Sequence, residues 1–142
     1  MRSRRGIKWI VWGLLVVCLG QALYIYISAP GRPDPVKIVS VTNVGEGGGI
    51  YEVLYDSGGA TVPTVYRYFL MDLQPGDAQA LQKIKKVAPF LVTKSSKAVR
   101  EILDDRVKLR VDGVIYEFHN ISLFKVGDEI NIVKFDLDSI AP

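Results

Sequence analysis

The chain has 142 residues, of which 49% are hydrophobic and 23% are charged, with one Cys and one His. This length allows one modest domain, and a single Cys and a single His exclude an intramolecular disulfide framework and zinc sites built from several thiolates or imidazoles. Four of the 18 basic residues lie in the first 29 positions, a stretch without acids, so the remainder carries 14 basic and 15 acidic side chains. A near-neutral domain gives no reason to expect nucleic acid as a partner.

The first expected element is a transmembrane helix over residues 9–27. This stretch carries no formal charge, and at ~1.5 Å per residue it spans ~28 Å, close to the ~30 Å hydrocarbon core of a bilayer. Aromatic residues that favour membrane interfaces lie at both ends, namely Trp9, Trp12, Tyr24 and Tyr26. We expect these four to act as the membrane anchor residues.

The flanking charges predict the orientation of this helix. Residues 1–8 form a basic stub, which the positive-inside rule places in the cytoplasm. The Pro-rich stretch 28–35 is then a stiff linker, and residues 36–142 form an extracytoplasmic domain, periplasmic or extracellular, at the inner (plasma) membrane. A cleaved signal peptide is the alternative, disfavoured because the small-x-small cleavage pattern is missing around Ala29.

The domain begins with three segments of period-two hydrophobicity, which predict strands over 36–43, 50–56 and 64–73. Glycine-rich loops connect them. On the second strand Tyr51, Val53 and Tyr55 share one face. After the break at residues 75–77, apolar residues at helical spacing predict a helix over 78–88, which Pro89 ends.

The second half of the domain predicts one more helix and two hairpins. Ser95 or Ser96 could cap a short helix with Val99, Ile102 and Leu103 on one face. Asp112-Gly113 predicts a two-residue turn that pairs residues 107–111 with 114–118. A last hairpin is expected around Gly127-Asp128, with a register that the pattern does not fix. The expected fold class is therefore α+β, a small antiparallel sheet with one or two helices.

The sequence gives little evidence of a catalytic site. Asp56-Ser57-Gly58-Gly59 resembles the GDSGG motif of chymotrypsin-like serine proteases, with Tyr55 in place of the first Gly. In that family the histidine precedes the serine, whereas His119 follows Ser57 here and falls on a face predicted to be solvated. A turn is the simpler interpretation of these glycines, and an anchored serine hydrolase using Ser57 is kept only as an alternative.

Other polar groups favour structural roles. The Gly45–Gly49 loop lacks the lysine and the following helix of a P-loop. Asp136 and Asp138 supply too few oxygens for a calcium site, and the lysines of the predicted helix are typical of a solvated face. We therefore expect no metal, no cofactor and no enzymatic activity.

One resemblance bears on function. The run Asp56-Ser57-Gly58-Gly59-Ala60-Thr61, followed by an aromatic strand on a short chain with one N-terminal anchor, resembles small single-pass bacterial envelope proteins in which a Gly-Ala-Thr turn precedes a strand. Some of those proteins are immunity proteins that protect a cell from injected toxins. The resemblance implies a protein-binding role and assigns no toxin-binding residue.

The sequence therefore predicts a membrane-anchored protein-binding module, with an immunity protein that neutralises an antibacterial toxin as the leading interpretation. An accessory subunit of an envelope secretion or conjugation machine is the second. Core packing is the simpler interpretation of the aromatic residues on the second and third strands. If the tyrosines beside the arginine are exposed, they form the composition that binding hot spots favour. The candidate partner-binding residues are Tyr66, Arg67 and Tyr68 on the third strand, with Glu46 and Asp56 in the adjoining loops.

Overall fold

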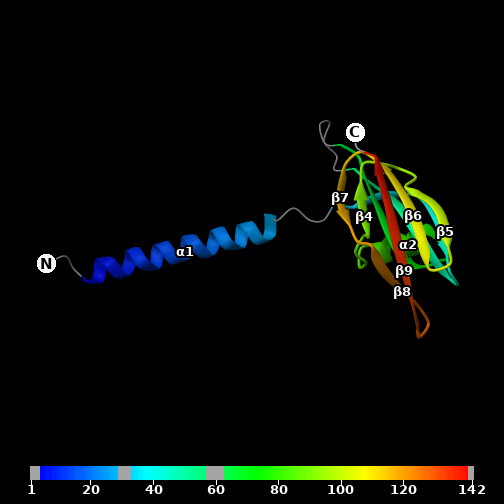
Figure 1. Ribbon diagram of the computed structural model, residues 1–142. Helices are drawn as coiled ribbons and strands as arrows, with labels where there is room; N and C mark the ends of the chain where they lie inside the picture. The colour runs from blue at the N-terminus through cyan, green and yellow to red at the C-terminus, as the bar shows by residue number, and fades with distance from the viewer. Residues whose placement is uncertain (1–3, 29–32, 57–62, 141–142) are drawn as a thin grey trace. The chain divides into compact units, whose positions relative to one another are not determined.

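The structure, a computed structural model, describes residues 4–28, 33–56 and 63–140 (Figure 1). The chain divides into two units, Met1–Arg32 and Pro33–Pro142. The described residues of the first unit form one helix, α1 (Arg4–Ser28), which contains the predicted 9–27 span and extends it at both ends. Over Gly6–Ser28 its mean hydropathy reaches 2.1, so by length and composition it is a candidate membrane span, as an anchor or as a signal sequence.

The second unit is a domain of two β-sheets and one short helix, which confirms the α+β class. Its strands are β1 (Pro35–Val44), β2 (Gly48–Tyr55), β3 (Val65–Asp72), β4 (Leu91–Thr93), β5 (Val99–Leu103), β6 (Arg106–Asp112), β7 (Ile115–Phe118), β8 (Ile121–Val126) and β9 (Glu129–Ile140). The helix is α2 (Asp77–Ile84). The five-stranded sheet has the order β1-β2-β3-β4-β7, and the four-stranded sheet has the order β5-β6-β9-β8.

Strands β1, β2 and β3 form the antiparallel meander that the alternation predicts. Both faces of β2 and β3 are buried. One face places Tyr51, Val53 and Phe69 against Ala80 and Ile84 of α2. Helix α2 therefore covers the outer face of the five-stranded sheet, and the two-sided burial explains why these strands are more hydrophobic than a half-exposed sheet would require.

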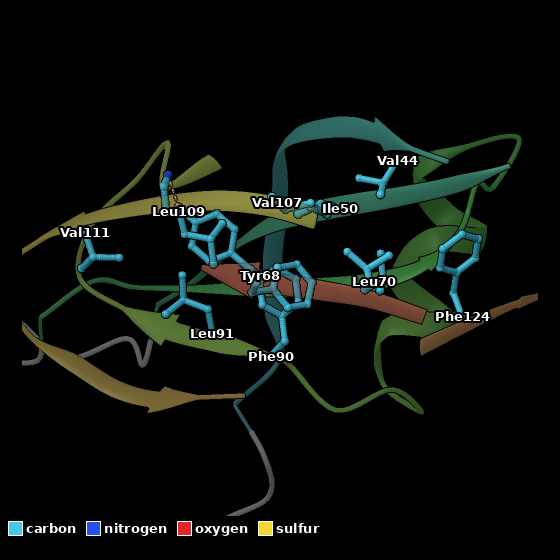
Figure 2. Close-up of a cluster of buried hydrophobic side chains, with 13 residues drawn as sticks. Val44, Ile50, Tyr68, Leu70, Phe90, Leu91, Val107, Leu109, Val111 and Phe124 are labelled. Atoms are coloured by element: carbon cyan, nitrogen blue, oxygen red, sulfur yellow. Dashed lines mark hydrogen bonds between the residues drawn. The ribbon is translucent and has the colours of Figure 1, made fainter. Parts of the chain in front are cut away.

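The opposite face of the meander meets the four-stranded sheet and forms the main core (Figure 2). The rings of Phe90, just before β4, and Phe135, on β9, stack with centroids 3.9 Å apart. Tyr68 packs beside Phe90, with centroids 6.3 Å apart. These aromatic contacts join the two sheets at the centre of the domain. The buried members of this core are Val44, Ile50, Tyr68, Leu70, Phe90, Leu91, Ala98, Val107, Leu109, Val111, Phe124, Val133 and Phe135.

Helix α2 confirms the helix predicted over 78–88, although it ends earlier, at Ile84. The N-cap is Gly76, whose extended backbone supplies no capping side chain. Lys83 on α2 forms an ion pair with Asp72 at the end of β3. This ion pair links the helix to the sheet that it covers.

The Asp72–Lys83 ion pair predicts a small pH dependence of stability. Burial raises the pKa of Asp72, but the hydrogen bond and charge of Lys83 outweigh it, so the pKa lies below its ordinary value. A lowered carboxyl pKa stabilises the fold above the unfolded-state value of ~3.9, and this contribution disappears as pH falls through the folded-state value. We expect Asp72→Asn to lower the free energy of unfolding at pH 7 by less than about 1 kcal/mol.

Urea denaturation at several pH values checks this prediction. The difference between wild type and Asp72→Asn should shrink as the pH is lowered from about 4 through the lower pKa of Asp72 in the folded state. Asp138→Asn is the control, because Asp138 is exposed. A difference that stays constant down to pH 2 would contradict the role of this ion pair.

The second helix predicted near residues 95–103 is wrong, because Val99–Leu103 is strand β5. Ser95 does not cap a helix. Its hydroxyl donates to the carbonyl of Asp112 (2.6 Å) and accepts from the amide of the same residue (3.2 Å). Residues 99–103 pair with β6 instead, so a tertiary pairing with a buried strand decides the conformation of this segment.

The hairpin predicted at Asp112-Gly113 is also wrong. Strand β6 belongs to the four-stranded sheet and β7 to the five-stranded sheet, so the turn passes from one sheet to the other. Strand β6 pairs in parallel with β9 over seven residues, and β7 pairs with β4. The predicted inward face of β6 is nevertheless confirmed, since Val107, Leu109 and Val111 are fully buried.

The last hairpin is confirmed, and its register is now defined. Strand β8 pairs with β9 around the two-residue turn Gly127-Asp128, with Val126 opposite Glu129. Gly127 has φ +61°, the positive value that the first central position of a type II′ turn requires. Because β9 also pairs with β6, the expected single antiparallel sheet is in fact two sheets with one parallel pairing.

Candidate functional site

Arg67 occupies a half-buried position on the outer face of the five-stranded sheet. Its guanidinium lies 4.5 Å from the centroid of the Tyr55 ring, a cation–π contact. Its Nε atom is buried and has no hydrogen-bond partner among the described residues. Burial raises the pKa of Tyr55, although the charge of Arg67 acts in the opposite direction. An arginine held on an aromatic ring in this way is suited to a carboxylate of a binding partner.

The two tyrosines beside Arg67 differ in accessibility. Tyr66 is half-buried, and its side chain packs on the edge of the main core. Tyr68 is fully buried, so its side chain belongs to the core and offers no surface to a partner. Its hydroxyl donates to the carbonyl of Ser95 (2.9 Å) and accepts from the amide of Ala98 (3.1 Å), and burial raises its pKa. Of the three strand residues, Arg67 is therefore the most suitable for binding.

The remaining sequence-predicted positions do not form one site. Glu46 is exposed in the β1–β2 turn, and Asp56 is exposed directly after β2. Ser57, with the motif that includes it, lies outside the described residues. His119 is exposed as predicted, and its Nε2 lies 2.9 Å from Oε1 of Glu117.

Some of the carboxylates and lysines considered in the sequence form ion pairs at the surface. Asp136 contacts Arg106 (3.1 Å), and Lys85 contacts Asp34 (3.1 Å). Over residues 4–28, 33–56 and 63–140, no group of three or more His, Cys, Asp or Glu side chains could hold a metal ion. These pairs match the solvated surface that the sequence predicts for them.

An apolar surface that the sequence did not single out lies on the outer face of the β8–β9 hairpin. Leu123 and Ile132 face each other across the two strands and are 60% and 57% exposed. Ile121 and Ile130 extend this surface on either side, opposite Lys134 and Lys125. Strand β6 begins to pair with β9 only at Lys134, so the hairpin continues beyond the sheet as a two-stranded ribbon (Figure 1). We call these four aliphatic side chains the hairpin patch.

Strand β8 also has an open backbone edge, because it ends the order of its sheet. The residues beside a two-residue turn exchange hydrogen bonds, so the backbone groups of Val126 face β9. The Phe135 amide donates to the Asn120 carbonyl (2.8 Å), which confirms that every second residue counted back from Val126 turns its backbone groups toward β9. The amides and carbonyls of Ile121, Leu123 and Lys125 therefore point away from β9.

The other edge strands carry features that discourage pairing with another chain. The β1–β2 register is interrupted twice, and the β5–β6 and β4–β7 registers once each. Strand β7 is also only four residues long. Such irregularities and short lengths protect sheet edges. The β8–β9 register has no interruption, so β8 is the edge best suited to accept a further strand.

A polar pocket of about 320 Å³ is a second feature that the sequence did not predict. Glu52 lines it and is only 2% exposed. Its carboxylate accepts from the Ser40 hydroxyl (2.8 Å) and from the Lys97 amide (3.0 Å). The second bond holds Lys97 at φ +56°, an uncommon backbone for a residue with a side chain. The sequence contains a sign of this pocket. Glu52 lies two residues after Ile50, so both are on the same face of β2, and that face is otherwise apolar.

Comparison with protein-family models, with curated proteins and with solved structures found no match to this chain.

Proposed function

We propose that this protein is a membrane-anchored, extracytoplasmic module that binds another protein through the open edge of β8 and the hairpin patch. The observation that carries the proposal is the coincidence of a regular, uncapped edge strand with four exposed aliphatic side chains on the same hairpin. A strand added to an open edge gains main-chain hydrogen bonds, while side chains at alternate positions give specificity. The partner segment is therefore extended and aliphatic at alternate positions.

The charges beside the patch refine the partner. Lys125 lies on β8 itself, and its nearest acid, Asp128, is 3.8 Å away at the exposed turn. Lys134 lies at the other corner of the patch. A carboxylate next to the aliphatic residues of the partner strand would meet these lysines. Arg67, stacked on Tyr55, offers a second carboxylate-binding position on the other sheet.

The anchor gives this module its location. The candidate span of α1 precedes the domain, and four basic residues precede the apolar segment. Together they support an N-terminus in the cytoplasm and a domain on the other side of the membrane. Within this proposal, the immunity role is the leading interpretation, because a tethered binder stays in the compartment where an injected toxin arrives.

Leu123→Pro tests the β8 edge. The Leu123 amide points away from β9, so proline removes the donor that a partner strand would use without removing a bond between β8 and β9. Leu123→Val is the matched control, because it keeps the amide and the apolar side chain. We expect a deletion strain challenged by toxin-delivering neighbours to lose survival, and to regain it with wild type or Leu123→Val but not with Leu123→Pro.

Two further observations separate the parts of this proposal. A C-terminal reporter active only in the cytoplasm, or a mature chain that starts near residue 30, would overturn the anchored orientation. Unchanged survival of the deletion strain would overturn the immunity role. If the full chain in detergent retains a resident membrane protein, and Leu123→Pro releases it, the accessory-subunit interpretation replaces the immunity role while the edge proposal stands.

A further inference from the structure

The pocket around Glu52 lies between elements of both sheets. Ser40 and Thr42 come from β1, Ile50 and Glu52 from β2, and Tyr68 from β3. The other wall comes from the segment that leads into β5 and from its first residues, namely Lys97, Val99 and Arg100. Sheet edges β1 and β5 therefore border an opening into the interior of the domain. The hairpin patch contributes no residue to this pocket.

The Glu52 carboxylate has acceptor capacity that the domain leaves unused. Its two oxygens accept one hydrogen bond each, from Ser40 and from Lys97. The Tyr68 hydroxyl is also close enough to interact with this carboxylate, but its own hydrogen bonds go to the Ser95 carbonyl and the Ala98 amide. An ionised carboxylate can accept about four. No described lysine, arginine or histidine lies within ion-pair distance of it. A buried charge is costly unless it is paired, so the bottom of the pocket is complementary to a group with several N–H donors.

The chemistry at the mouth of the pocket is the opposite. The side chains of Lys97 and Arg100 are both exposed, and neither has an ion-pair partner in the described part of the chain. Cations at this position repel a positive charge at the outer end of a ligand and attract a carboxylate there. An arginine can bind such a carboxylate through two parallel hydrogen bonds. Between bottom and mouth, Ile50 and Val99 add an apolar wall that fits a short carbon skeleton.

We infer that this pocket binds a small zwitterion with a primary ammonium group and a carboxylate, the chemistry of a free amino acid. The ammonium group binds Glu52 and the nearby hydroxyls of Ser40 and Thr42. The carboxylate binds Arg100 and Lys97. A buried anion at one end and exposed cations at the other define the orientation of the ligand. This inference does not depend on the β8 edge or on the identity of a protein partner.

Calorimetric titration of the full chain in detergent tests this assignment with five probes. L-alanine and 4-aminobutyrate carry both charged groups at two spacings. Glycine betaine keeps both charges without N–H donors, putrescine carries only ammonium groups, and succinate carries only carboxylates. We expect at least one of the first two to bind at least about tenfold more tightly than the other three, because a desolvated charged hydrogen bond is lost with each of those.

Two variants locate the binding groups. Glu52→Gln should weaken binding of the zwitterion at least about tenfold. Arg100→Gln should weaken the zwitterion and strengthen putrescine, because the repulsion at the mouth falls. Arg106→Gln is the matched control, because Arg106 is an exposed arginine that pairs with Asp136 and does not line the pocket, and it should change neither affinity.

Some outcomes would overturn the inference. It fails if none of the five probes binds the folded wild type at up to about 10 mM, or if betaine binds as tightly as alanine. It also fails if Arg100→Gln leaves every affinity unchanged. Because the Arg100 side chain is exposed, this variant decides the question even if Glu52→Gln does not fold.

Discussion

Replacing Phe90 by Ala should lower the free energy of unfolding by about 3–5 kcal/mol. Phe90 is only 1% exposed. Its ring stacks on Phe135 at 3.9 Å and packs against Tyr68 at 6.3 Å between centroids. Phe135 lies on the four-stranded sheet, while Tyr68 lies on the five-stranded sheet. The substitution therefore removes apolar contacts with both sheets and leaves a cavity between them.

Near-UV circular dichroism during urea denaturation measures this loss in the full chain in detergent. Both tryptophans, Trp9 and Trp12, lie in α1, so tryptophan fluorescence would report on the helix and not on the domain. The matched control is Leu123→Ala, because Leu123 is 60% exposed and its removal opens no interior cavity. A loss of less than about 1 kcal/mol for Phe90→Ala would show that the two sheets are not held together at this point.

The parts of the fold that the sequence predicts correctly depend on neighbours in the chain. Strands β1, β2 and β3 form a meander, and β8 and β9 form a tight hairpin, so alternation and turn residues were sufficient. Helix α2 likewise shows its own periodicity and ends before Pro89. In each case the residues that decide the structure belong to one element or to elements that follow each other directly in the sequence.

The two errors have a common cause in a long-range pairing. The parallel partner of Val107 is Phe135, which lies far along the chain. Once β6 pairs with β9 and β5, it cannot also pair with β7, despite the favourable turn at Asp112-Gly113. The pairing of β6 with β5 and β9 overrides both the local hairpin signal at Asp112-Gly113 and the helix-compatible spacing near Val99. No periodicity within a short window contains that information.

For the candidate sites too, local composition identifies some residues, whereas the exposure of others depends on how distant strands are arranged. Arg67 was selected from composition alone; the structure places it half-buried on the Tyr55 ring, and its binding role stays a prediction. Tyr68 shares the same local composition but lies in the core, because the second sheet covers its face. The hairpin patch was not identified because the exposure of Leu123 depends on which face of the β8–β9 hairpin packs into the core, and that face carries Phe124 and Val133. Which face is exposed is thus a property of the strand order.

Adding a methyl group at Gly48 should destabilise the domain by about 1–3 kcal/mol, whereas the same change at the neighbouring Gly49 should cost less than about 1 kcal/mol. A Cβ at Gly48 would lie 2.3 Å from the Phe124 ring and 2.6 Å from the Val44 carbonyl oxygen. Phe124 is buried in the main core, and the Val44 oxygen belongs to the backbone of β1, so neither can move freely. At Gly49 the nearest atom belongs to the Leu73 side chain, which is partly exposed and can change rotamer. The next atom, in the buried Tyr51 ring, would lie 3.1 Å away and would have to shift by only a few tenths of an ångström.

Urea denaturation of Gly48→Ala and Gly49→Ala separates a tight contact from the general effect of replacing glycine. Alanine restricts the unfolded chain more than glycine, which by itself favours both variants by about 0.4–1 kcal/mol. Combining Gly48→Ala with Phe124→Leu should not restore wild-type stability, because the contact with the Val44 oxygen persists. Equal stability of the two alanine variants would mean that β8 does not pack on the β1–β2 turn as closely as the contact between Gly48 and Phe124 requires. The hairpin would then be held less rigidly at the β1–β2 turn, although β8 also packs on β3. The orientation of the β8 edge would be correspondingly less fixed.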